Sequence, residues 1–486
     1  MLALDQIAVI LPASAFWLFV LYLAAYRPVI FLGFFFILFT MLWRTGSTAF
    51  IDLAGPVWSS QTVRYVGPGL ATPLHVLAYF VTLVPFVLVL QSKAVKVWVH
   101  QCDRRCAPAE VFTIADLTFA LSSLFLAYLL VDMARRGSIP LFVHTERHEY
   151  TSSTAGEAHR WVVRYGSFLA FWWGLMVASG RLRNRSIDFR YVGLLATLLV
   201  YMFLSGNRFS AFYSLLSFFL IPLSAVAAQA EIRKSAVPFH WIGREFRARD
   251  IAMMAASLAL VIALAAAAIF NNLVSVRGYH GSEVMSEFWE RSLIQPSEMG
   301  WISYERIFVL NQWQPDKVYN FLFEHPLDPG KNTTPQYLML ETIGEPRTSE
   351  HILAGFQFAG GFPEIFFELF GPIYSWTFLL GWGAIAALLT ALIVKGTLQG
   401  RYASAFMALY VLYGFFVSYI GGMLNFVTVE SYWIKIAALA VSLILESRLA
   451  AEGLSLLPWA VTTINGPALT RAVRFIRPRR QLRVSK

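Results

Sequence analysis

The chain has few charged residues. Of its 486 residues, 14% are charged, 57% are hydrophobic and 16% are aromatic. A soluble protein would carry about a quarter charged residues. Apolar runs of roughly twenty residues recur along the whole length, and each could cross a ~30 Å hydrocarbon core as a helix. Because these runs are continuous rather than alternating, the sequence predicts an all-α polytopic membrane protein and argues against a barrel.

Cysteine and the familiar catalytic motifs are also scarce. The two cysteines, Cys102 and Cys106, form C-x-x-x-C, which is neither a redox nor a zinc spacing, so we expect unpaired thiols. The sequence contains no P-loop, dinucleotide fingerprint, H-E-x-x-H or nucleophile elbow. The histidines lack the close spacing of metal ligands. We therefore expect neither a metal nor a cofactor.

About eleven apolar segments predict transmembrane helices. They lie near residues 7–26, 29–52, 71–90, 111–133, 161–179, 191–204, 211–228, 251–270, 364–393, 402–420 and 427–448. This pattern divides the chain into eight spans with short loops (1–270), one large loop (271–363), three spans (364–448) and a basic tail (449–486).

Basic residues predict the orientation of these spans. Every odd-numbered span is followed by a basic segment, which the positive-inside rule places in the cytoplasm. The N-terminus and the large loop are then periplasmic, and the C-terminus is cytoplasmic. The basic tail could in principle bind nucleic acid. On a membrane protein, contact with anionic lipid headgroups is the better interpretation, so no nucleic-acid partner is expected.

The large loop is the predicted meeting place with a polar substrate. It carries six basic and eleven acidic residues, whereas the predicted inner loops are basic. Apolar side chains recur at helical spacing in two stretches, 285–289 and 301–308. This spacing predicts short amphipathic helices that rest on the membrane or on the bundle.

Four arginines at predicted outer helix ends are candidate ligands of a lipid-linked diphosphate. The guanidinium fork binds phosphate oxygens in pairs and keeps its charge. The alternative for each arginine is an ion pair with a nearby glutamate, or extension toward lipid headgroups. The candidates are Arg208, Arg277, Arg291 and Arg347.

Two acidic residues could likewise have either a structural or a functional role. Glu430 lies in the outer half of the last predicted span, where an unpaired carboxylate is costly. A buried structural pair, for example with Arg208, and a functional role are equally open. Pro363 and Glu364 predict a helix start at the outer face, whose free N–H groups could hold an anion or a sugar. Ordinary helix capping is the alternative there.

Several short motifs occur in an order that resembles the Wzy-type polymerases of bacterial surface polysaccharides. The resemblance covers most of the chain and includes the span count and the single large loop late in the sequence. The motifs are the stretch from Arg136 to Phe142 (RGSIPLF), Ser205 to Arg208 (SGNR), Gly344 to Arg347 (GEPR) and Pro363 to Gly371 (PEIFFELFG). Arg277 and Arg291 stand where the family has loop arginines.

The resemblance implies a membrane glycosyltransferase that joins undecaprenyl-diphosphate-linked repeat units at the periplasmic face of the bacterial inner membrane. It implies no metal, and its partners would be these lipid-linked glycans, membrane lipids and a chain-length regulator protein. The acceptor hydroxyl needs a base within hydrogen-bond reach. The candidate bases are His351 and Glu345, with Glu298 behind them, and the candidate supporting residues are Arg136, Glu364 and Glu430.

Three alternatives remain open. An O-antigen ligase has a similar plan and chemistry, but it transfers the glycan to lipid A–core. A lipid-linked oligosaccharide flippase or another transporter would show inverted repeats and polar groups near mid-membrane, and the sequence shows no repeat. A scaffold role for the large loop is the last alternative.

Overall fold

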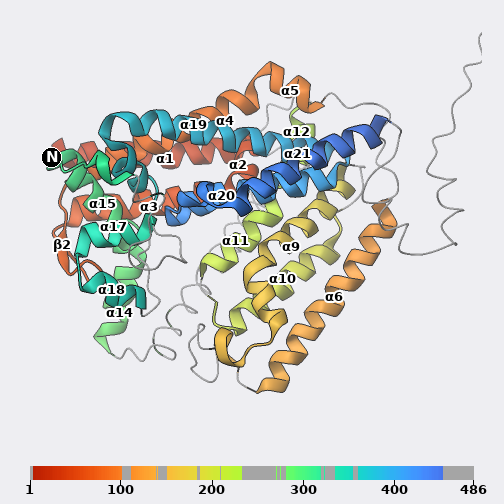
Figure 1. Ribbon diagram of the computed structural model, residues 1–486, viewed down its shortest axis with the longest axis horizontal. Coiled ribbons are helices and arrows are strands. Elements are labelled where there is room, and N and C mark those ends of the chain that lie inside the picture. The colour runs from red at the N-terminus through yellow and green to blue at the C-terminus, as the bar shows by residue number, and fades with distance from the viewer. Residues whose placement is uncertain are drawn as a thin grey trace, which may run out of the picture.

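Helices make up most of this computed structural model. It describes residues 4–100, 111–137, 139–140, 150–182, 187–207, 209–232, 270, 274, 281–318, 322, 334–353 and 360–451. Two short strands, β1 (Val57–Ser59) and β2 (Arg64–Val66), pair as one antiparallel hairpin. The helices form two groups, which lie at an angle to each other in Figure 1.

The first group packs around one long helix, α19 (Glu364–Gln399). α4 (Ala71–Gln91) and α20 (Tyr402–Gly421) pack directly against it. α1 (Leu4–Tyr26), α2 (Pro28–Gly33) and α3 (Phe35–Ala54) pack against α4, and α21 (Glu430–Ala451) packs against α20. α19 approaches α4 closely at Gly383, where a Cβ atom would collide with the carbonyl oxygen of Thr82. Small residues at such contacts let membrane helices pack backbone to backbone.

The second group has its own apolar core and packs against the first. It comprises α6 (Val111–Arg136), α9 (Glu157–Leu182), α10 (Phe189–Leu204), α11 (Phe209–Leu220) and α12 (Leu223–Ile232). Trp173, Leu175 and Leu198 are among its fully buried side chains. α11 and α12 contact α3, α2 and α19, so they join the two groups. A short helix, α5 (Lys93–His100), follows α4.

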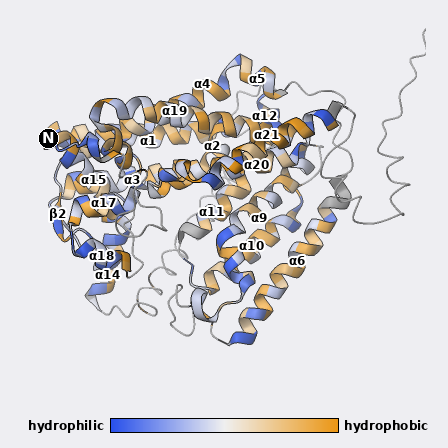
Figure 2. Cartoon of the chain, in the orientation of Figure 1, coloured by the Kyte–Doolittle hydropathy of each residue, from blue (hydrophilic) through white to orange (hydrophobic). Residues whose placement is uncertain are grey.

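The helical membrane class is confirmed. Among the described residues, five helices are long and apolar enough to cross a membrane: α1, α4, α19, α20 and residues 115–136 of α6. A sixth span is possible if α11 and α12, which bend by 41° at a short break, cross together. Figure 2 shows the apolar residues that run along these helices. The predicted span 29–52 is divided into α2 and α3, and the predicted span 251–270 lies outside the described residues except for Phe270.

The described parts of the predicted large loop are helical and sit at one end of the first group. They include α14 (Ser282–Trp289), η3 (Glu290–Ile294), α15 (Glu298–Tyr304), η4 (Glu305–Val309), η5 (Pro315–Lys317), α17 (Thr334–Ile343) and α18 (Arg347–Leu353). Short helices were predicted at 285–289 and near 301–308, and both are present. We call these helices, together with the β1–β2 hairpin, the cap. In Figure 1 the chain's N-terminus lies at the cap end, and α21 ends at the opposite side.

Candidate functional site

A buried ion pair connects α3 to the start of α19 beneath the cap. Arg44, on α3, pairs with Glu364 and also donates to the carbonyl oxygen of Phe362. Their side chains are 5% and 0% exposed. Glu364 Oε1 also accepts the N–H of Gly361 at 2.5 Å. Removing two charges from water is costly, so such a pair persists only where the surrounding hydrogen bonds compensate.

The two glycines before α19 allow this geometry. Gly360 and Gly361 have φ values of 134° and 147°, which side chains rarely tolerate. A Cβ atom on Gly361 would also collide with the backbone of Gly422 at the end of α20. The Gly-Gly pair therefore lets the chain turn into α19 while touching α20. At this helix start the N–H groups of Ile365 and Phe366 donate to the carbonyl oxygens of Gly361 and Pro363 at 3.0 and 2.9 Å, so these two donors already have backbone partners.

Polar side chains of α4 face the ion pair. His75 and Tyr79 are four residues apart on the same face of α4, and both are buried. His75 Nδ1 lies 3.4 Å from the hydroxyl of Thr48. The Tyr79 ring stacks on Phe362 with a centroid distance of 5.9 Å. Within the described residues, the Tyr79 hydroxyl, Arg44 Nε and Glu364 Oε2 are buried without a hydrogen-bond partner.

Helix α15 of the cap packs against α3 and α4 and covers the ion pair. The hydroxyl of Ser297 donates to the carbonyl oxygen of Arg44 at 2.9 Å. Gly300 lies directly against the His75 ring, and a Cβ atom there would be 2.7 Å from it. Trp301 donates to Asp52 at 3.0 Å, and Asp52 also accepts the N–H of Thr72 at 2.7 Å. Asp52 thus accepts hydrogen bonds from the first turn of α4 and, through Trp301, connects α15 to α4.

Glu298, the first residue of α15, is a buried carboxylate of the cap. Its side chain is completely buried, with Oε2 accepting the Ser59 hydroxyl at 2.6 Å. Oε1 has no hydrogen-bond partner in the described part of the chain. Burial raises the pKa of Glu298 to about 7, against the lowering effect of the Ser59 hydrogen bond, and nearby Glu290 raises it further. A carboxylate with this pKa can accept or release a proton near neutral pH.

A second set of charges ties the cap to α19 one turn further along. Arg306, on η4, lies 2.9 Å from Glu341 of α17 and 3.7 Å from Glu368 of α19. Glu368 also accepts the hydroxyl of Ser303 at 2.8 Å. Glu364 and Glu368 are four residues apart, so they lie on the same face of α19. The cap is therefore held to that face by charged and hydrogen-bonded contacts.

The structure brings two of the sequence-predicted residues to this site, Glu298 and Glu364. Arg291 instead forms an ion pair with Glu287 one helical turn earlier, which is the alternative that the sequence left open. Arg136 pairs with Asp132 at 3.0 Å and donates to the carbonyl oxygen of Thr154. Arg208 and Arg277 lie outside the described residues.

The remaining predicted residues lie at other places in the fold. Glu345 is exposed and accepts the hydroxyl of Ser349 at 2.7 Å, Arg347 is exposed at the start of α18, and His351 is half-buried on the same helix. No hydrogen bond or ion pair between described residues joins these three to Glu298 or Glu364. Glu430 is exposed in the first turn of α21. Among the described residues, no group of three or more His, Cys, Asp or Glu side chains is arranged to hold a metal ion.

Sequence reasoning missed Arg44, Asp52 and His75. A signal for the first two was present, because both are charged residues inside the predicted second span, where insertion is costly unless the charge has a partner. No local pattern identifies the partners, because Arg44 and Glu364 are 320 residues apart. His75 lies in the third span and gives no such signal by itself.

One family matches part of the chain. Residues 328–434 are similar to a family described as "Family of unknown function (DUF6418)". The matched stretch contains α17, α18, α19 and α20, and hence Glu364 and Glu368, but neither α3 nor α15. No curated protein and no solved structure matches the chain.

Proposed function

We propose that the protein polymerises undecaprenyl-diphosphate-linked oligosaccharide repeat units into a surface polysaccharide. The product would be O-antigen, capsule or exopolysaccharide, made at the periplasmic face of the bacterial inner membrane. A hydroxyl of one lipid-linked unit attacks the anomeric carbon of another, a new C–O bond forms, and undecaprenyl diphosphate leaves. The hydroxyl proton passes to a base, and cationic side chains stabilise the departing diphosphate.

The observation that carries this proposal is the environment of Glu298. It places a carboxyl group with a pKa of about 7 where the cap meets the membrane helices. A general base works best when its pKa is near the operating pH. Glu345 is exposed and already accepts a hydroxyl hydrogen. Glu298 is therefore the preferred base of the three candidates, ahead of His351 and Glu345.

Arginines supply the positive charge in this proposal. Arg208, Arg277 and Arg347 remain the proposed diphosphate ligands, and Arg291 joins them if it separates from Glu287. Arg44 adds a buried guanidinium whose Nε has no partner in the described part of the chain. An arginine at the membrane face can stabilise a leaving diphosphate by electrostatics alone. Arg136, Glu364 and Glu430 keep supporting roles, with Glu364 holding Arg44 in place.

Substrate access to Glu298 requires the cap to open, because the carboxyl group is fully buried. The cap segment 290–305 is joined to the hairpin by an ion pair between Arg64 and Glu305 and by hydrogen bonds from Ser60 to Glu290. Each of these contacts is at least partly exposed, and exposed ion pairs contribute only ~0–1 kcal/mol. Opening also breaks the buried hydrogen bond between Ser59 and Glu298 and separates Val66 of the hairpin from Trp301 and Ile302 of α15, so these buried contacts are the main barrier to it.

The proposed topology has eleven spans, with the N-terminus and the cap in the periplasm and the C-terminus in the cytoplasm. The common location of the N-terminus, the hairpin and the cap helices at one end of the bundle supports this sidedness (Figure 1). The basic segments after the odd-numbered spans support the same orientation. A chain-length regulator protein is the further partner expected for such an enzyme.

The proposal can be tested by deleting the gene and complementing it with single variants. Glu298→Gln keeps the shape of the side chain but removes the base, so surface glycans should shorten to single repeat units. Glu283→Gln is the matched control, because Glu283 is exposed in the same cap. The readout is the ladder of polysaccharide lengths on a gel. A normal ladder from Glu298→Gln, expressed at the wild-type level, would show that Glu298 is not the base.

The same experiment separates the related ligase activity. Loss of a ligase leaves long lipid-linked chains that are not attached to lipid A–core, whereas loss of a polymerase leaves attached single units. If the deletion strain makes long glycan chains that are not attached to lipid A–core, the protein is a ligase and not a polymerase.

A transporter is the second candidate, and the broken helices favour it. α19 contains Gly371 at φ 69° followed by Pro372, and α11 and α12 are bent by 41°. Transporters bind substrates at such interruptions, often beside buried charges such as the Arg44–Glu364 pair. Deletion of a flippase would trap the repeat units on the cytoplasmic side, so no single units would reach the surface.

A further inference from the structure

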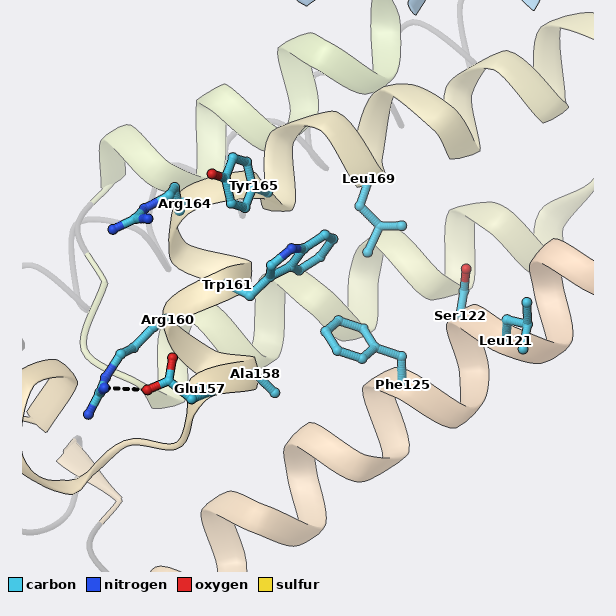
Figure 3. Close-up of a pocket in the computed structure, with 10 residues that line it drawn as sticks. All are labelled: Leu121, Ser122, Phe125, Glu157, Ala158, Arg160, Trp161, Arg164, Tyr165 and Leu169. Atoms are coloured by element: carbon cyan, nitrogen blue, oxygen red, sulfur yellow. Dashed lines mark hydrogen bonds and ion pairs between the residues drawn. The ribbon is translucent and has the colours of Figure 1, made fainter. Parts of the chain in front are cut away.

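A pocket of about 860 Å³ lies between α6 and α9 in the second helix group. Figure 3 shows the side chains that line it. They include Leu121 and Phe125 of α6, and Trp161, Arg164, Tyr165 and Leu169 of α9. None of these residues belongs to the site beneath the cap. The volume lies within the range of ~300–1,000 Å³ that is usual for small-molecule sites.

The pocket is apolar at one end and basic at the other. Leu121, Phe125 and Leu169 line the apolar end, where the hydroxyl of Ser122 is already bound by the indole N–H of Trp173 at 2.9 Å. Trp161 lies between the two ends and packs against Phe125 with a centroid distance of 5.6 Å. In Figure 3, Arg160 and Arg164 extend from the opposite end. The lining thus offers a contact for a hydrocarbon chain and a cation for an anionic group.

Only one of the two arginines is available to a ligand. Arg160 is bound to Glu157 at 2.5 Å and to the carbonyl oxygens of Thr151 and Ser152. Arg164 lies over the ring of Tyr165 at 6.0 Å and has no hydrogen bond or ion pair to any described residue. Because Arg160 neutralises Glu157, the net charge at this end of the pocket is that of Arg164.

The sequence predicts that α9 crosses the membrane from about residue 161, and in that placement the pocket lies within one leaflet of the bilayer. Arg164 and Leu169 lie three and eight residues beyond Trp161 in α9. At ~1.5 Å per residue, these positions are roughly 5 and 12 Å along the helix. Half of a ~30 Å hydrocarbon core is about 15 Å, so in this placement the apolar end lies near the middle of the membrane. Arg164 can extend its side chain back toward the headgroups.

The two helices are also exposed to their surroundings on the side of the pocket. In the most apolar window of α6, 22% of the residues are buried, compared with 50% in α4 and 56% in α20. Leu121 is 58% exposed and Trp161 is 45% exposed. A lipid can therefore reach the pocket sideways from the bilayer.

We propose that this pocket binds one anionic phospholipid. Its phosphate pairs with Arg164, and one acyl chain lies between α6 and α9 against Phe125, Trp161 and Leu169. Trp161, at the start of the predicted span, sits at the level where aromatic side chains contact the headgroup region. A polyprenyl carrier is a poorer fit, because a pocket that ends at mid-membrane covers only part of such a long chain. The occupant is thus a bilayer lipid rather than the substrate proposed above.

Native mass spectrometry of the purified full-length protein tests this proposal. The protein is delipidated in mild detergent and then titrated with phosphatidylglycerol or with zwitterionic phosphatidylethanolamine. We expect the wild type to retain one phosphatidylglycerol in preference to phosphatidylethanolamine. Arg164→Gln should weaken phosphatidylglycerol binding at least tenfold, because it removes the charge that pairs with the phosphate. Arg135→Gln is the control, because Arg135 is also exposed near this end of α6 but does not line the pocket.

A second pair of variants tests the apolar end. Leu169→Trp should fill the pocket and reduce the binding of both lipids. Leu121→Trp, at an exposed position, should have the same effect and replaces Leu169→Trp if that variant does not fold. Loss of binding in Arg164→Gln together with either tryptophan variant supports the site. Equal binding of the two lipids to the wild type, or unchanged binding in Arg164→Gln, would show ordinary bulk lipid and overturn the proposal.

Discussion

Replacing Glu298 by glutamine should make the protein more stable while it abolishes activity. In the folded protein, burial raises the pKa of Glu298 from its ordinary value of 4.5 to about 7. The difference is about 2.5 pKa units, and each unit corresponds to ~1.36 kcal/mol, so ionisation of Glu298 costs the folded state about 3 kcal/mol. Glutamine has nearly the same shape but cannot ionise, so the variant avoids this cost.

The sign of the pH dependence follows from proton binding. Between about pH 4.5 and pH 7 the folded protein holds a proton on Glu298 that the unfolded chain has released, so this residue lowers stability as the pH rises. At pH 5 the wild type and Glu298→Gln should therefore unfold at similar temperatures. At pH 8 the variant should unfold at the higher temperature. Melting curves of the detergent-purified proteins at half-unit pH steps would measure this difference.

Two results would refute this reasoning. A Glu298→Gln variant that melts below the wild type by the same interval at every pH would mean that Glu298 ionises normally. A gain in stability that is the same at pH 5 and pH 8 would show that packing, not charge, is responsible. Glu283→Gln again serves as the control and should leave the pH profile unchanged. Higher stability together with lost activity is the pattern expected for a functional group that is held in a costly environment.

Three further predictions concern the same region. Arg44→Met should destabilise the protein by about 3–5 kcal/mol, because it leaves Glu364 buried without its partner, and the double variant Arg44→Met/Glu364→Gln should recover much of that loss in melting experiments. Asp52→Ala should cost ~1–2 kcal/mol through loss of the α4 cap, measured as a lower melting temperature, with Asp52→Asn retaining part of it. Gly361→Ala should reduce the amount of folded protein in the membrane, measured by fluorescence-detected size exclusion, because its Cβ atom collides with the backbone of Gly422, whereas Gly381→Ala, with open space at its Cβ position, should not.

The sequence was a good guide wherever the controlling pattern is local. The limits of α4 and α20 agree with the predicted spans to within one residue, because an apolar run bounded by polar or glycine residues defines a membrane helix by itself. The helices α14 and α15 follow from the spacing of their apolar side chains. The pairing of Arg291 with Glu287 is also local, since residues four apart on a helix are neighbours. It could have been ranked above phosphate binding from the sequence alone.

The sequence did not predict the break between α11 and α12. One apolar stretch predicted one straight span, and Pro222 lies at the bend that divides it. Proline removes a backbone donor and disfavours a continuous helix, so the signal was present but was outweighed by the hydropathy of the run.

The sequence by itself determined that this is a helical membrane protein and where helices such as α4 and α20 begin and end. Hydropathy and helical spacing are properties of neighbouring residues, so they need no knowledge of the fold. Only the tertiary structure decided which charges meet. Arg44 pairs with Glu364 across 320 residues, and Ser59 binds Glu298 across 239. The pKa of Glu298 depends on burial beneath the hairpin, and burial arises only when distant segments pack together.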